Sequence, residues 1–88
     1  MAERFTISGR LGASMPPWIG RHAARIGIEA RIRSESTRRI ELWVDGPPAL
    51  LDAMEMGCLL GPIDIWIDSI RREPLETFTR IPVIGQSA

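Results

Sequence analysis

Hydrophobic and polar residues alternate along four separate stretches of this chain. The apolar positions are Phe5 and Ile7 in residues 4–8, Ile28, Ala30 and Ile32 in residues 28–33, Ile40, Leu42 and Val44 in residues 38–45, and Ile63, Ile65 and Ile67 in residues 63–71. An alternation with a period of two is typical of a β-strand with one buried side. The pattern therefore predicts four strands, and the short polar stretch between the second and third makes those two a hairpin.

Two other stretches carry apolar residues at helical spacing. The first is expected to bury Ile19, Ala23 and Ile26, and the second Leu51, Met54 and Cys58. Each begins with two prolines, Pro16-Pro17 and Pro47-Pro48, which suit the first turn of a helix because an N–H is not needed there. Ser14 is a candidate N-cap of the first helix, and Gly27 is expected to end it.

The order of elements is therefore β-α-β-β-α-β. With right-handed crossovers it predicts an α+β fold: a ferredoxin-like βαββαβ sandwich whose antiparallel sheet has the strand order 4-1-3-2 and carries two helices on one face. We expect one domain over residues 1–88, because two cores in so short a chain would each be too small. Residues 74–88 are expected to form a tail, with a possible edge strand over residues 78–83.

Composition excludes several classes of function. Eleven basic residues, all Arg, balance eleven acidic ones, which disfavours a nucleic-acid binder. One cysteine and one histidine cannot build a structural zinc site, so we expect neither metal nor cofactor. The sequence offers no apolar run long enough to cross a bilayer and no signal-peptide core, so we predict a cytoplasmic protein without a membrane partner.

The frame of the chain resembles that of the acylphosphatases. Residues 21–62 are similar to the family's pattern of helix, Gly27, strand, turn and strand, followed by a helix set between Gly46-Pro47 and Gly61-Pro62. Ser8-Gly9-Arg10 resembles the end of the family's first strand. The resemblance implies the same fold and the activity for which the family is known, the metal-free hydrolysis of acyl phosphates. There, main-chain N–H groups of the first loop and its closing Arg hold the phosphate, and an Asn after the second strand positions water.

This sequence departs from the family at both catalytic positions. Its first loop is one residue short, which places Pro16 or Pro17 at the position of the Arg, and Ser34 stands at the position of the Asn. The chain has no Asn at all. We therefore predict a divergent member that lacks the catalytic Arg and Asn, and whose acyl-phosphate hydrolysis is lost or much reduced.

The first loop still offers main-chain donors for a small anion or an acyl phosphate. Gly12, Ala13, Ser14 and Met15 all carry an N–H, and such groups before a helix favour anions. A plain loop with a helix cap is the alternative. In a second alternative the domain is an active acyl-phosphate hydrolase, in which Arg10 or Arg21 holds the phosphate and Ser34 positions the water.

Trp43 and Trp66 alternate out of phase with the buried residues, so both are expected on the open face of the sheet with Arg31 and Arg33. Three explanations remain open: cover by the C-terminal tail, a homodimer or other protein-interaction face, and a platform for nucleic-acid bases, which the neutral charge disfavours. His22 is interpreted as a surface or packing residue rather than a general acid or base. Cys58 is interpreted as a small buried hydrophobe.

Overall fold

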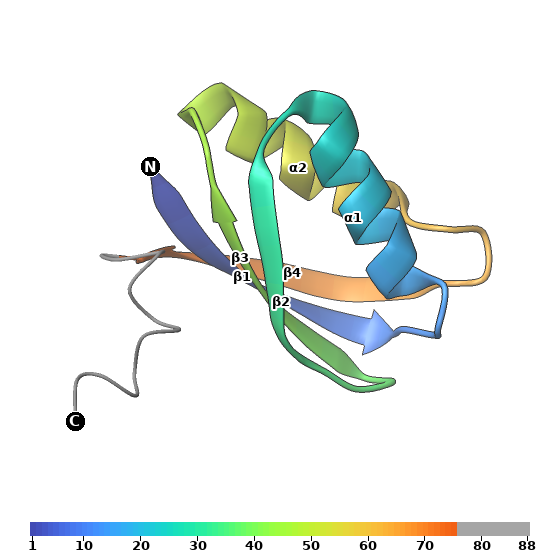
Figure 1. Cartoon of the computed structure of the whole chain (residues 1–88). Helices are drawn as coiled ribbons and strands as arrows, with labels where there is room; N and C mark the ends of the chain where they lie inside the picture. The colour runs from blue at the N-terminus through green and yellow to red at the C-terminus, as the bar shows by residue number, and fades with distance from the viewer. Residues whose placement is uncertain (76–88) are drawn as a thin grey trace, which may run out of the picture.

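Two helices cover one face of a four-stranded antiparallel sheet in the computed structural model, which describes residues 1–75 (Figure 1). The elements are β1 (Ala2–Arg10), α1 (Met15–Ile26), β2 (Glu29–Glu35), β3 (Arg39–Asp45), α2 (Pro48–Leu60) and β4 (Trp66–Leu75). The strands lie in the order β2-β3-β1-β4, which is the predicted order read from the opposite edge. The predicted βαββαβ sandwich is confirmed.

The core lies between the helices and the inward positions of the sheet. Its fully buried members come from both layers: Phe5, Ile7, Met15, Ile19, Ile40, Leu42, Val44, Leu51, Met54 and Cys58. The period-two and helical patterns selected all of these except Met15, which belongs to the first turn of α1. Burial of these side chains supplies most of the free energy that holds the helices on the sheet.

The ends of α1 are fixed differently from each other. Gly27 ends the helix as predicted, with a φ of 83°, and its N–H donates to the Ala23 carbonyl at 2.9 Å. That left-handed backbone favours glycine. Ser14 stands at the N-cap position, but its hydroxyl makes no capping bond and donates instead to the Asp64 carboxylate at 3.1 Å. The first loop is thereby tied to the segment before β4.

The fourth strand begins later and ends later than predicted. Ile63 was expected to point inward, yet it is fully exposed, because residues 62–65 form a turn in which the Ile65 N–H donates to the Pro62 carbonyl at 3.1 Å. The strand then runs through Pro74, which an edge strand tolerates. The tail predicted from residue 74 therefore starts within β4, and the edge strand predicted over residues 78–83 lies outside the described residues.

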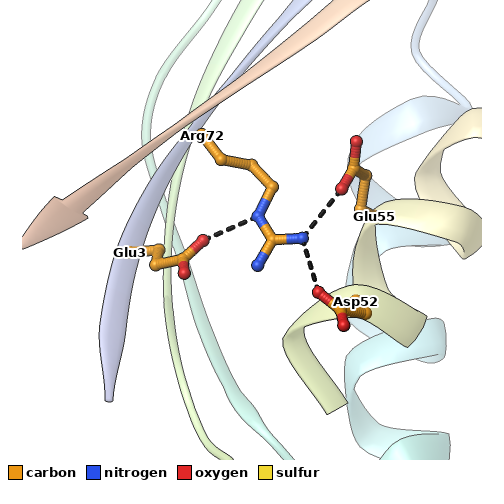
Figure 2. Close-up of polar contacts among 4 residues, drawn as sticks. All are labelled: Glu3, Asp52, Glu55 and Arg72. Carbon is orange, nitrogen blue, oxygen red and sulfur yellow. Dashed lines mark hydrogen bonds and ion pairs between the residues drawn. The ribbon is translucent and has the colours of Figure 1, made fainter. Parts of the chain in front are cut away.

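An ion-pair cluster around Arg72 joins the sheet to α2 (Figure 2). The Arg72 guanidinium donates to Glu3 on β1 at 2.7 Å, and to Asp52 and Glu55 on α2 at 2.8 Å each. It also lies 5.2 Å from the centre of the Phe5 ring. The hydrogen bond to Glu3 raises the pKa of Arg72 above its ordinary value, and those to Glu55 and Asp52 act in the same direction.

Candidate functional site

Three connecting segments meet at one end of the sheet: the β1–α1 loop (residues 11–14), the β2–β3 turn (residues 36–38) and the α2–β4 loop (residues 61–65) (Figure 1). The end of β1 bonds directly to the turn, because the N–H groups of Gly9 and Leu11 donate to the carbonyls of Arg38 and Thr37 at 3.1 and 2.7 Å. The Ser14–Asp64 bond attaches the third segment. The β1–α1 loop is thus held from both sides.

The Ser36 side chain gives the β2–β3 turn its shape. Its hydroxyl oxygen accepts from the N–H groups of Arg38 and Arg39 at 3.2 and 3.1 Å, and the Ser36 N–H donates to the Arg39 carbonyl at 2.9 Å. A serine hydroxyl that bonds to nearby main-chain groups is a common way to stabilise a turn. The turn therefore presents Thr37 and Arg38 to the β1–α1 loop from a defined position.

An apolar pocket of about 240 Å³ lies between the loop and the turn. It is lined by Leu11, Gly12, Ala13, Pro16, Glu35, Ser36, Thr37 and Ile40. Pro16 and not Pro17 lines this pocket, and Pro17 is exposed to solvent. Among the residues that the structure describes, Glu35 is the only charged one in this lining, and its carboxylate repels an anion.

A second, more open pocket of about 370 Å³ shares Leu11, Gly12 and Thr37 with the first. Its remaining lining residues are Arg10, Arg38 and Asp64. Two arginines and one aspartate therefore line this pocket, and the Asp64 carboxylate already accepts a hydrogen bond from the Ser14 hydroxyl. The electrostatics of this pocket favour an anion, in contrast to those of its apolar neighbour.

The loop N–H groups are available in three of the four predicted positions. Within residues 1–75, those of Gly12, Ala13 and Ser14 have no protein acceptor. The prediction is wrong for Met15, because its N–H donates to the Gly12 carbonyl at 3.1 Å and its side chain lies in the core. An anion at this loop can therefore be bound by three main-chain N–H groups and by the residues that line the two pockets.

Two further predicted residues lie away from these pockets. Arg21 is exposed on α1, and Ser34 is exposed near the end of β2; neither lines the pockets described above. Sequence reasoning did not single out Thr37 and Arg38. The signal that could have found them was the predicted strand order, because strands 1 and 3 are antiparallel neighbours and the end of one must meet the start of the other.

The structure is similar to two solved acylphosphatases. The acylphosphatase from Bacillus subtilis superposes with a TM-score of 0.79 over 89% of this chain and 88% of that protein, at 14% sequence identity. The acylphosphatase from Coxiella burnetii gives a TM-score of 0.76 over 89% and 85%, at 15% identity. The chain has an acylphosphatase-like fold. No protein-family model and no curated protein matches its sequence.

The open face of this acylphosphatase-like fold differs from the prediction at Trp43. The Trp43 side chain is only 8% exposed, because the Arg33 guanidinium lies 4.6 Å above its ring and its indole N–H donates to Glu41 at 2.8 Å. Trp66 is 66% exposed and donates to Asp68 at 2.9 Å. Cover by the C-terminal tail concerns residues outside the described part of the chain.

The two tryptophans do not form one patch on this fold. Trp43 is paired with Arg4 of β1, and Trp66 with Arg10. Six residues of β1 at ~3.4 Å each separate the two positions by roughly 20 Å along the strand. An interaction surface built from both rings is therefore not what the acylphosphatase-like fold presents; Trp66 alone offers an exposed ring.

His22 and Cys58 have structural roles in the acylphosphatase-like fold. The His22 Nε2 lies 3.1 Å from the Ala53 carbonyl on α2, so the imidazole joins the two helices, as its interpretation as a packing residue requires. Cys58 is fully buried, and burial together with the charge of Glu55 raises the pKa of its thiol to about 12. A thiol in that state is a poor nucleophile.

Residues 1–75 also contain no helix with both the length and the apolar character that a bilayer span demands.

Proposed function

We propose that this chain is an acylphosphatase-like domain in which acyl-phosphate hydrolysis is lost or much reduced, and which retains a weak site for a small anion at the β1–α1 loop. The observation that carries the proposal is the lining of the apolar pocket beside the loop donors. Pro16, one of the two candidates for the family's Arg position, lines this pocket, and Glu35 carries the only charge among the described residues of the lining.

The chemistry of phosphoryl transfer explains why this lining matters. Such enzymes do little covalent work and depend on placing the phosphoryl group and stabilising its charge. A prolyl ring offers neither a charge nor an N–H, whereas an arginine offers a fork of donors. Loss of one transition-state donor costs about 3 kcal/mol, or a hundredfold in rate, and the absence of a carboxamide at Ser34 adds a second loss.

Relocated groups receive little support from the geometry. Arg21 and Ser34 line neither pocket, so they are not gathered around the loop as an alternative active site would need. Arg10 does lie beside the loop, on the side of the second pocket. A cation without a group to position water favours binding over hydrolysis.

Benzoyl phosphate hydrolysis tests the proposal. The purified chain is compared with the Bacillus subtilis acylphosphatase, assayed alongside as the active reference. Two losses of about a hundredfold each predict a turnover roughly ten-thousandfold lower than that of the reference. Turnover within about tenfold of the reference would contradict the loss of activity, whatever anion the loop binds.

A further inference from the structure

We propose that the anion site of this domain has two compartments and takes an organic oxyanion, a carboxylate or a phosphate, carried on a compact apolar group. The proposal rests on the anion site of the proposed function and specifies its ligand. The cationic compartment is the open pocket at Arg10 and Arg38, and the apolar compartment is the pocket at Leu11, Pro16 and Ile40.

The two compartments are parts of one site because they share a wall. Leu11, Gly12 and Thr37 line both pockets. The wall is fixed by the hydrogen bond from the Leu11 N–H to the Thr37 carbonyl, at 2.7 Å. The proposed ligand places its charge on one side of this wall and its apolar group on the other.

The charges of the lining residues decide which pocket takes the charged end of the ligand. Arg10 and Arg38 belong to the open pocket, and guanidinium groups bind oxyanions through charge-assisted hydrogen bonds. Asp64 lies in the same pocket and opposes the anion, but its carboxylate is engaged by the Ser14 hydroxyl at 3.1 and 3.3 Å. In the apolar pocket the Glu35 carboxylate repels an anion, so the charged end belongs with the arginines.

The apolar pocket has a suitable size for the other end of the ligand. Its volume of about 240 Å³ and its lining of Leu11, Ala13, Pro16 and Ile40 suit a phenyl-sized group. Small-molecule sites commonly combine apolar walls with a few placed polar groups. Gly12, whose N–H is available, and Thr37 line both pockets and so mark the boundary, where the oxyanion joins its apolar carrier.

The test is a titration of the ¹⁵N-labelled chain, followed by NMR, with inorganic phosphate, phenyl phosphate and benzoate. The amide signals of Leu11, Gly12 and Thr37 are the readout. Phenyl phosphate is expected to bind about tenfold more tightly than inorganic phosphate, because binding buries its apolar ring away from water. Benzoate separates the two sources of the oxyanion: equal affinity for benzoate and phenyl phosphate indicates a carboxylate site as much as a phosphate site.

Variants test each compartment separately. Arg10→Ala and Arg38→Ala should each lower the affinity for phenyl phosphate roughly fivefold to tenfold. Arg21 is an exposed arginine outside both pockets, so Arg21→Ala should change this affinity less than about twofold. Ala13→Leu narrows the apolar pocket and should remove the preference for phenyl phosphate over inorganic phosphate. Asp64→Asn keeps an acceptor for Ser14 and should strengthen binding.

Three results would overturn the inference. Equal affinity for phenyl phosphate and inorganic phosphate would contradict the apolar compartment. Equal effects of Arg10→Ala and Arg21→Ala on the affinity for phenyl phosphate would contradict the cationic compartment. Absence of amide shifts with all three anions at millimolar concentrations overturns both the inference and the anion site of the proposed function. The loss of hydrolysis would be untouched, because the benzoyl phosphate assay tests it independently.

Discussion

The imidazole of His22 occupies the space in which Gly57 would carry a side chain. A Cβ built on Gly57 would overlap the His22 imidazole. Next to it, the Trp18 indole N–H donates to the Gly57 carbonyl at 3.0 Å, and His22 itself bonds to the Ala53 carbonyl. The contact between α1 and α2 therefore depends on a bare main chain at this position of α2.

Gly57→Ala should destabilise the protein by about 1–2 kcal/mol, because displacement of His22 outweighs the roughly 1 kcal/mol by which alanine favours a helix. The effect should reverse sign in the background His22→Ala, where the added methyl group meets no imidazole. Gly20→Ala is the matched control: it lies in α1 with nothing within 4 Å of its Cβ and should stabilise slightly. Chemical denaturation of the four variants measures the coupling. Additive effects of the two substitutions would contradict this account.

The Arg72 cluster should contribute more to stability than the exposed ion pair on the opposite face. Arg72→Met leaves Glu3, which is 9% exposed, without its cation and should lower the free energy of unfolding by about 2 kcal/mol. Glu3→Gln in the same background should recover part of the loss. Arg4→Met, which breaks the pair with Glu73, is expected to have a much smaller effect. Urea denaturation at neutral pH compares them, and equal losses for Arg4→Met and Arg72→Met would exclude a special role for the cluster.

Much of the fold could be predicted from the sequence because its signals are local. Alternation marked the strands, and Gly27 stood where a left-handed backbone closes α1. The role of Glu3 in the ion-pair cluster could not be predicted from local signals. A carboxylate at an inward position is explained only by its bond to Arg72, which lies 69 residues away in the sequence. The exposure of Ile63 depends on a turn that the alternation of isoleucines conceals.

The site was less predictable because it is assembled from separate segments. The resemblance suggested Pro16 or Pro17 for the Arg position and Ser34 for the Asn position, yet only the fold shows that Pro16 lines a pocket and that Ser34 lines neither. Arg38 joins the site through main-chain bonds between the end of β1 and the β2–β3 turn. Trp43 was expected on the open face with Arg33, but the alternation could not show that the arginine covers the ring.

Cys58 should make the stability of the protein sensitive to alkaline pH. Its pKa rises from 9.0 to about 12 in the folded state, chiefly through burial. Between these values the unfolded chain releases the thiol proton while the folded chain keeps it, so stability is complete below pH 9 and falls as the pH increases, by up to ~1.4 kcal/mol per pH unit. The sequence contains no Lys or Tyr that would titrate in this window. Denaturation between pH 8 and 11 should show a shallower slope for Cys58→Ala, and identical slopes would refute the assignment.

Substitution of the two tryptophans should change the stability of the protein by very different amounts. Trp43→Ala removes a ring that is buried beneath Arg33 and should cost about 3 kcal/mol of stability. Trp66→Ala removes an exposed ring and should change stability by less than ~0.5 kcal/mol. If the face is a homodimer surface, sedimentation at high concentration should show a dimer that Trp66→Ser disrupts. A monomer that Trp66→Ser leaves unchanged would count against that use of the face.

A guanidinium at Pro16 should strengthen the anion site where the same residue at Pro17 does not. Pro16 lines the apolar pocket beside the available N–H groups of Gly12 and Ala13, whereas Pro17 is exposed. Pro16→Arg should therefore bind inorganic phosphate about tenfold more tightly than the parent chain, through charge-assisted hydrogen bonds, and should lose the preference for an apolar carrier. Pro17→Arg adds the same charge and removes the same kind of ring, so it separates placement from net charge. Phosphate titrations by NMR measure both variants; an equal gain in the two would show that charge alone, and not the position of Pro16 at the pocket, governs binding.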